Sequence, residues 1–230
     1  MKSGISKIVR DLINAHPFIK ECFVLNIVNY SALARYLVNE LKKLGVDASF
    51  DAVKMALIRL RSELYEERRF LEEKVRGLLA NSVLELQTDL VVLTVRKASL
   101  LPRLSDLAKA MEGARFFQIV QGTDNFTLII TREVKDVVVE AVGRDNILDF
   151  IEGQTAIILI SPIDIITTPG FVAYVTSILA SNGINITQII SCYKDTLLII
   201  NRDDALKAYQ VLEQLILSTR KAMECSECNY

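Results

Sequence analysis

The hydrophobic pattern divides the chain into a helical first third and a remainder in which strands and helices alternate. Within the first 80 positions, apolar residues recur at helical spacing in Ile5–Ile13 and again in Tyr30–Leu44. The apolar stretch Phe18–Val28 fits either a helix or a strand. The pattern therefore predicts a small all-α domain at the N-terminal end.

Capping residues set the limits of the clearer helices. Asn29 or Ser31 can cap the helix that begins near Tyr30, and Gly45 is suited to end it. Ser49 can cap the next helix. These positions predict two successive helices joined by a short turn.

The helix after Ser49 is expected to be long, because no glycine or proline interrupts it before Gly77. Leucines at 57, 64, 71 and 78 recur every seven residues, but the companion positions are Leu60, Glu67 and Lys74. Only one side of such a seam is apolar, which argues against a strong coiled coil. The leucine row either pairs loosely in a dimer or packs on the chain's own domains.

From Ala156 onward the pattern reads β-α-β-β-α. A buried strand over 156–161 precedes a loop and a helix over 171–180, with Thr168 as its expected N-cap and Pro169 at its first position. Strands are expected over 184–192 and 196–200. Asp203 or Asp204 then caps a helix over 205–217.

The same order precedes it, so the chain contains an internal repeat. Val83–Val95 predicts one strand, or two strands broken near Thr88–Asp89. The remaining elements are a helix from Leu101 to Gly113, strands over 115–121 and 126–130, and a helix over 134–142. Ile147–Ile151 is a candidate fourth strand for this repeat. The second repeat has no clear fourth strand of its own, and Val83–Gln87 is a candidate to supply it.

The fold class is therefore α+β, with tandem ferredoxin-like βαββαβ modules behind an all-α domain and a long connecting helix. The expected limits are residues 1–62 for the helical domain, 63–82 for the connecting helix, 83–153 and 154–220 for the two modules, and 221–230 for a polar tail.

The second module resembles the ACT domain, a small module that senses amino acids and other small molecules. The resemblance is carried by Thr168-Pro169-Gly170, by Gly183-Ile184-Asn185-Ile186 and by the return strand T-L-L-I-I. Its nearest likeness is to the regulatory ACT modules of aspartokinases. That likeness implies that one module is inserted into the other, and that ligands bind at an interface between two modules.

A ligand site is expected at the start of the 171–180 helix, because free N–H groups there suit a carboxylate. Gly170 would let a ligand approach the backbone, and Gly170, Phe171 and Val172 would present the amides. Asp164 could meet an ammonium group. The resemblance carries over Thr168, Pro169, Gly170, Asn185 and Ile186 as site residues.

The first repeat departs from the motif, since Pro102 is followed by Arg103 rather than glycine and Ala114-Arg115-Phe116 stands in place of G-x-N-I. It is expected to have lost binding and to act as a structural partner. In the second repeat Thr167-Thr168 stands where many relatives have Asp, Asn or Lys. The alternative there is that Pro169-Gly170 and Asn185 only shape turns.

Charge is uneven along the chain, although the net charge is only −1. Residues 1–80 carry 14 basic and 10 acidic side chains, whereas residues 81–230 carry 13 and 18. A basic end permits nucleic-acid binding. In a helix-turn-helix interpretation Lys54, Arg59 and Arg61 would contact DNA; the alternative is a solvated helix face.

Catalytic and metal motifs are lacking in the sequence. His16 is the single histidine, with no evident nucleophile beside it, and no phosphate-binding loop or dinucleotide fingerprint occurs. Cys225 and Cys228 form one C-x-x-C pair, which is too few ligands for zinc unless two chains meet. The other interpretation is a disordered tail in which the two thiols have no function. We expect no cofactor, no metal and no enzymatic activity.

Three functions remain open. The first is a regulatory protein that binds an amino acid and signals to its helical domain. The second adds DNA binding as a transcriptional regulator, and the third is a structural or regulatory subunit without a ligand of its own. A cytoplasmic location, a homodimer or higher oligomer and no membrane partner are expected.

Overall fold

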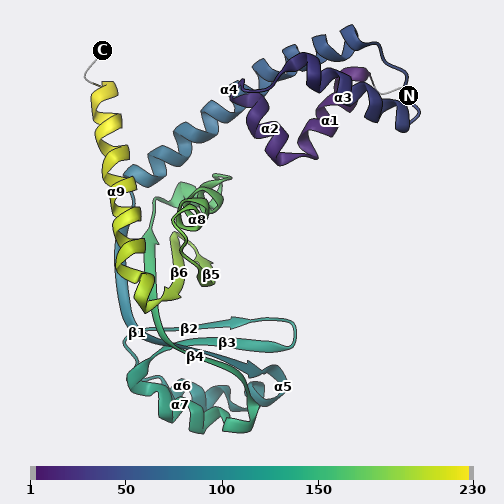
Figure 1. The fold of residues 1–230 in the computed structure, drawn as a ribbon. Helices are drawn as coiled ribbons and strands as arrows, with labels where there is room; N and C mark the ends of the chain where they lie inside the picture. Colours follow the sequence, from purple (N-terminus) through teal and green to yellow (C-terminus); the bar gives the residue numbers. More distant parts are fainter. Residues whose placement is uncertain (1–3, 228–230) are drawn as a thin grey trace. The chain divides into compact units, whose positions relative to one another are not determined.

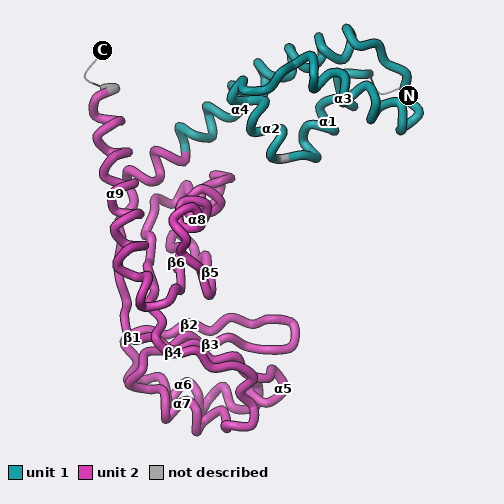
Figure 2. Tube along the Cα trace, viewed as in Figure 1, with its two compact units in different colours: residues 1–74 teal, residues 75–230 magenta. Residues whose placement is uncertain are grey.

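The computed structural model describes residues 4–227. The chain divides into two compact units between Lys74 and Val75, which Figure 2 colours as residues 1–74 and residues 75–230. The fold class is α+β, with helices at the N-terminal end, a six-stranded antiparallel sheet and a C-terminal helix (Figure 1). Among the described residues, no helix combines the length and apolar character needed to cross a bilayer.

The described part of the first unit, residues 4–74, contains four helices, and the last of them continues into the second unit. They are α1 (Ile5–Asn14), α2 (Pro17–Val24), α3 (Tyr30–Lys43) and α4 (Phe50–Ala80). The stretch that fitted either a helix or a strand is thus helical at its start, where proline occupies the first position of α2. A single buried cluster, which includes Phe23, Leu37 and Leu57, forms the core of this unit.

The predicted caps of α3 and α4 are confirmed. The Asn29 side chain accepts hydrogen bonds from the backbone N–H groups of Ser31 and Ala32 at 3.0 and 3.1 Å. The Ser49 hydroxyl accepts from the N–H of Ala52 at 3.2 Å. Of the two residues proposed for the α3 cap, Asn29 is therefore the one that acts.

Helix α4 is continuous over 31 residues, and its leucine row packs against the chain itself. Leu57 and Leu64 are buried in the core of the first unit, and Leu78 is buried in that of the second. Leu71, between these two cores, is 36% exposed. The interpretation that the leucines pack on the chain's own domains therefore holds for the three buried ones.

The sheet of the second unit has the strand order β2-β3-β1-β4-β6-β5, and every neighbouring pair is antiparallel. Its strands are β1 (Val83–Arg96), β2 (Phe117–Gln121), β3 (Asn125–Thr131), β4 (Ile147–Ile160), β5 (Ile186–Cys192) and β6 (Asp195–Asn201).

Helices cover each half of this sheet. The shorter ones, α5 (Lys97–Leu100), α6 (Leu104–Ala110) and α7 (Lys135–Val142), lie at the β2-β3 end, whereas α8 (Phe171–Ser181) and α9 (Arg202–Glu227) lie at the β6-β5 end (Figure 1). Helices α6 and α7 bury one apolar cluster, around Leu107 and Val138. Helices α8 and α9 bury another, around Val175 and Leu212. A third cluster of strand residues, among them Val92, Ile129 and Ile199, contains no helical residue.

The two central strands run through both halves of the sheet. Val83–Gln87 pairs with Ala156–Ile160, so the segment that the sequence suggested as the missing fourth strand does occupy that place. The first residues of β4, from Ile147 to Ile151, pair with the second half of β1, which confirms the other proposed fourth strand.

A local irregularity marks where each central strand passes from one half to the other. Asp89 has φ +58° and Gly153 has φ +65°, and the β1–β4 register shifts between Gln87 and Leu90. The break that the sequence indicated near Thr88–Asp89 is therefore a bulge inside one continuous strand.

Helix α9 is longer than the sequence pattern predicted. It begins at Arg202 and reaches Glu227 instead of ending at Leu217, so the segment 221–227 is helical rather than a disordered tail. The Arg220 side chain donates to the backbone carbonyls of Ala80 and Ser82, both at 2.6 Å, and thereby fixes these added turns. The expected cap was also wrong, because the Asn201 side chain, and neither Asp203 nor Asp204, accepts the first N–H bond at 2.9 Å.

Candidate ligand-binding site

Helix α8 begins two residues later than the proline position suggested. It runs from Phe171, with Gly170 as its N-cap in a left-handed conformation at φ +91°. Pro169 therefore lies outside the helix, and the prediction that it holds the first helical position is wrong. The physical reason is that the chain must reverse after a short 3₁₀ turn over Ile163–Ile166, and glycine adopts the required left-handed backbone without a Cβ penalty.

Thr168 does not cap α8 either. Its hydroxyl donates to the backbone carbonyl of Asp164 at 2.8 Å, and its side chain is largely buried. The Thr167 N–H donates to the same carbonyl at 3.1 Å. Asp164 thus organises the turn through its backbone oxygen, while its side chain is exposed.

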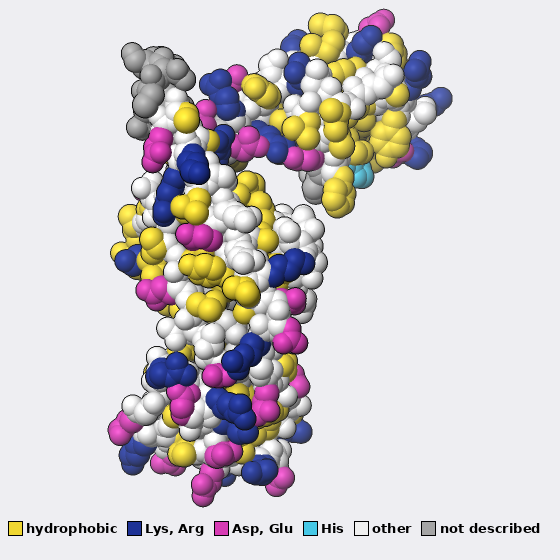
Figure 3. All heavy atoms as spheres, turned by 60° about the vertical axis from the view of Figure 1, so that its left-hand side comes forward, with side chains coloured by type: hydrophobic (Ala, Val, Ile, Leu, Met, Phe, Trp, Pro, Cys, Tyr) yellow, Lys and Arg dark blue, Asp and Glu magenta, His cyan; other side chains and the backbone are white. Residues whose placement is uncertain are grey.

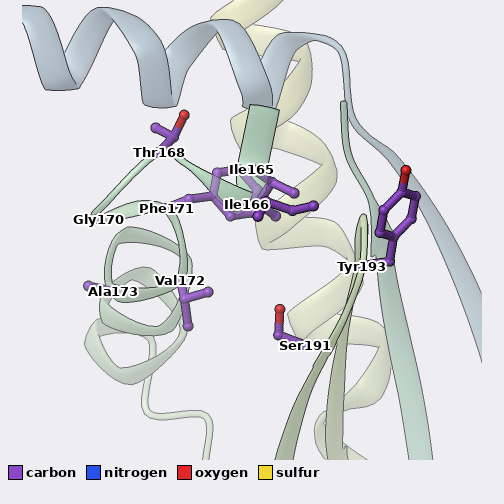
Figure 4. Close-up of a pocket in the computed structure, with 9 residues that line it drawn as sticks. All are labelled: Ile165, Ile166, Thr168, Gly170, Phe171, Val172, Ala173, Ser191 and Tyr193. Carbon is purple, nitrogen blue, oxygen red and sulfur yellow. The ribbon is translucent and has the colours of Figure 1, made fainter. Parts of the chain in front are cut away.

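A cavity of about 420 Å³ opens at this end of α8 (Figure 4). Thr168, Gly170 and Phe171, three of the predicted site residues, line it. Val172, whose backbone amide was expected to face the ligand, lines it as well. Sequence reasoning missed the other lining residues, which are Ile165, Ile166, Ala173, Ser191 and Tyr193.

The missed polar residues come from β5 and the turn that follows it. Ser191 lies near the end of β5, Tyr193 lies in the turn to β6, and Val172 points from α8 toward Ser191 (Figure 4). The β-α-β order could have predicted these residues. A strand that follows a helix runs back toward the start of that helix, so the end of β5 is expected near Gly170.

The cavity lining carries no acidic or basic side chain. The partial positive charge at the cavity comes from the N-terminus of α8. The first backbone N–H groups there, including those of Phe171, Val172 and Ala173, have no partner within the helix. Phe171 itself is 1% exposed and packs in the core, so only its backbone can serve a ligand. The site therefore suits a small molecule whose anionic or acceptor group meets backbone amides and whose body contacts apolar side chains.

Asn185 and Ile186 do not join this cavity. They follow the C-terminal end of α8, and eleven residues of helix separate the two ends by about 16 Å. Asn185 is exposed, while Ile186 packs against the core beneath α8 and α9. Within one chain, the predicted residues thus form two groups at opposite ends of the helix.

In the first repeat an arginine follows the proline where the second repeat has Gly170. Pro102 lies in a 3₁₀ turn before α6, and the Arg103 guanidinium donates to the carbonyl of Val142 at 2.9 Å and to that of Ala141 at 3.4 Å. These carbonyls are at the C-terminal end of α7, where a cation is favourable. Arg103 therefore has a structural contact in this repeat.

The three cations of the proposed DNA-reading helix do not share one face of α4. At 100° per residue, Lys54 and Arg61 lie within about 20° of one another, whereas Arg59 lies about 140° from Lys54. Arg59 is exposed, and Lys54 lies over the ring of Phe50 at 5.8 Å. DNA contact by these residues stays a prediction.

The single histidine and Cys225, the described cysteine of the C-x-x-C pair, are not part of the cavity at the start of α8. His16 precedes α2, where it is exposed and makes no side-chain capping bond. Cys225 is exposed in α9, and Cys228 lies outside the described residues. Over residues 4–227, no three His, Cys, Asp or Glu side chains are grouped as metal ligands would be.

Comparison with known proteins gives one sequence match, the ACT domain, over residues 150–214. No curated protein matches the chain. Solved structures that align with part of this chain include aspartate kinase of Clostridium acetobutylicum, at 15% identity and a TM-score of 0.49, over 58% of this chain and 34% of that one. The regulatory subunit of aspartate kinase from Thermus thermophilus aligns at 18% identity and a TM-score of 0.48, over 57% of this chain and 95% of that one.

The sequence match coincides with one half of the sheet. It begins within β4, includes α8, β5 and β6, and ends inside α9, so it contains the cavity at the start of α8. Residues 150–214 of this chain are therefore an ACT domain.

Proposed function

We propose that this chain is a non-catalytic regulatory protein whose ACT domain binds an amino acid or a similar small molecule at the start of α8. Binding there would change the arrangement of the helical unit formed by residues 1–74. The observation that carries the proposal is the cavity at the α8 N-terminus, inside the segment that matches the ACT domain.

The chemistry of the cavity fits a carboxylate with an apolar body. Unpaired amides at the first turn of α8 suit the carboxylate, and the side chains of Ile166 and Val172 suit the apolar part. Ser191 and Tyr193 add hydroxyl groups that can accept from an ammonium group or donate to the carboxylate.

A second ACT module would complete the site. Gly170 and Asn185 lie at opposite ends of α8 in one chain, so a ligand that meets both must lie between two modules. In a two-fold pair, each module would offer its α8 N-terminus to the Asn185 of the other. We therefore propose a homodimer or higher oligomer in which β5, an edge strand, lies near the contact.

We further propose that residues 83–153 and 154–220 are two ferredoxin-like modules that exchange strands through β1 and β4. The pairing of Val83–Gln87 with Ala156–Ile160 supports this division. The first module, in which Arg103 bonds the carbonyls of α7, would serve as the structural partner.

The test is a calorimetric titration of the purified chain with each of the twenty amino acids. The best ligand is then titrated into variants of the chain. Val172→Trp places a large ring in the cavity at a position that is already 37% exposed. It should weaken binding of the best ligand at least tenfold, about 1.4 kcal/mol. The matched control is Val137→Trp, an exposed valine on α7 in the other half of the sheet, which should leave affinity unchanged.

The variant Asn185→Ala distinguishes a ligand site formed between two modules from a ligand site within one module. It should weaken the same ligand if a second module completes the site, and it should have no effect if the cavity of one module suffices. Absence of any amino-acid binding, with a folded protein, would contradict the proposal and favour a structural or regulatory subunit without a ligand.

A further inference from the structure

We propose that the helical unit contains a second binding site, between α2 and α4, for a small organic carboxylate with an apolar body. This site is distinct from the ACT domain, because all of its residues belong to the unit formed by residues 1–74. The cavity measures about 200 Å³ and is lined by Val24, Leu25, Arg61, Tyr65, Arg68, Arg69 and Glu72.

Arg61 is the reason to expect a ligand. Its Nε atom is shielded from solvent and has no hydrogen-bond partner among the described residues. A shielded N–H donor without an acceptor is costly, and here it belongs to a half-buried cation. Such a group is stabilised when an anion enters the cavity and accepts from it.

The neighbouring arginines already have carboxylate partners. Arg68 forms ion pairs with Glu21 and with Glu72, and Arg69 forms them with Glu66 and Glu73, at 3.3 and 3.8 Å. No ion pair joins Arg61 to any described residue. The charge available to a ligand is therefore a single positive one, which matches a monocarboxylate better than a dianion.

The groups on the adjoining elements do not neutralise this charge. Burial raises the pKa of Tyr30 at the start of α3, and the nearby positive charge of Arg61 opposes that shift, so the phenol stays neutral near pH 7. The Tyr30 hydroxyl donates to the Asn26 side chain at 3.0 Å and is thus already engaged.

The rest of the lining favours an apolar body beside the carboxylate. Val24 is buried, and Leu25 and Tyr65 are 54% and 47% exposed, so an apolar group would cover surface that water now meets. Figure 3 shows hydrophobic side chains at the surface of the helical unit, interspersed with Lys and Arg. A carboxylate held by Arg61 with a ring or branched chain over Leu25 would satisfy both features.

The experiment is a calorimetric titration of the full chain with phenylacetate, with the uncharged phenylacetamide and with inorganic phosphate. We expect saturable binding of phenylacetate, at least tenfold weaker binding of phenylacetamide, and at least a tenfold loss for phenylacetate in Arg61→Gln. The matched control is Arg59→Gln, because Arg59 is an exposed arginine on another side of the same helix. It should bind phenylacetate as the unaltered chain does.

A second measurement needs no variant and so does not depend on its folding. Phenylglyoxal modifies accessible arginines, and peptide mapping reports each site. Phenylacetate should protect Arg61 and leave Arg59 reactive.

Three results would overturn the site: no binding of phenylacetate, equal binding by Arg61→Gln, or phosphate binding in place of phenylacetate. Protection of Arg59 and Arg61 alike by duplex DNA, without protection by phenylacetate, would replace it with a nucleic-acid surface. None of these outcomes depends on amino-acid binding at α8, since the Val172→Trp variant tests that site separately.

Discussion

Gly170 illustrates how one residue can have a role other than the one its motif suggests. It was expected to let a ligand approach the backbone, and apart from its two chain neighbours no described residue lies within 4 Å of the place where a Cβ would stand. What requires glycine is the left-handed conformation, φ +91°, that starts α8. The space beside it is open to a ligand, but the fold alone already accounts for the residue.

Gly170→Ala should therefore lower the free energy of unfolding by about 1–2 kcal/mol, because an alanine is strained in this region whatever the space around it. For a chain of this size that corresponds to a fall in Tm of roughly 2–8 °C, measurable by calorimetry.

Gly77→Ala is the matched comparison, since it lies inside α4 and also has nothing within 4 Å of an added Cβ. It should raise stability by about 0.5–1 kcal/mol, because alanine favours a helix over glycine. If both substitutions changed stability in the same direction, the conformational explanation would be wrong.

A pH effect is expected at Glu133. The ion pair with Arg115 lowers the pKa of this carboxyl to about 2 from its usual 4.5. The folded pKa is the lower one, so the stabilisation is present above pH 4.5 and is lost as the pH falls toward 2. A carboxyl NMR titration should show this low pKa, and Arg115→Gln should return it toward its ordinary value. A normal pKa in the unaltered protein would exclude the ion pair.

At the scale of elements, the helix caps show where the local sequence was sufficient to place the end of a helix and where it was not. Asn29 and Ser49 cap α3 and α4 as expected, because a cap depends on the three or four residues next to it. The start of α9 was placed too late, since Asp203 or Asp204 was expected as its cap and Asn201 was assigned to no element. It is both the last residue of β6 and the cap of α9.

Asn201→Ala should therefore lower the free energy of unfolding by about 1 kcal/mol, the usual cost of removing a side-chain cap. Asp204→Ala, three residues into α9, should cost less, because it removes only a favourable charge near the helix N-terminus. Urea titrations of the two variants compare them directly. A larger loss for Asp204→Ala would restore the original assignment of the cap.

On the scale of the whole molecule, shared strands make the two halves of the sheet interdependent. The ACT segment 150–214 contains most of β4 but not β1, although Val83–Gln87 is the neighbour of β4 on that side. Removal of β1 would expose a central strand that is rich in buried residues, such as Ile157 and Leu159.

A fragment of residues 75–230 should therefore fold, with the far-ultraviolet circular dichroism of an α+β protein and a cooperative thermal transition. A fragment limited to residues 150–214 should lack that transition, because its β4 edge is unpaired. Cooperative unfolding of the shorter fragment would show that the matched segment is independent of β1.

Much of this protein was determined by its sequence alone. The repeated β-α-β-β-α order and the long α4 follow from hydrophobic periodicity, which local burial imposes on the chain. The segments near Val83 and Ile147 were candidate fourth strands, and strand pairing decided their place. The ACT resemblance of the second repeat was also visible, because its turn glycines and proline are adjacent in the sequence.

Tertiary structure alone decided which residues meet. Ser191 and Tyr193 join Gly170 because β5 returns to the start of α8, while Asn185 stays at the other end of that helix. The extension of α9 depends on Arg220, which reaches carbonyls about 140 positions earlier in the chain. Neighbouring residues encode turns, caps and periodicity, whereas contacts between distant segments arise only when strands pair and helices pack.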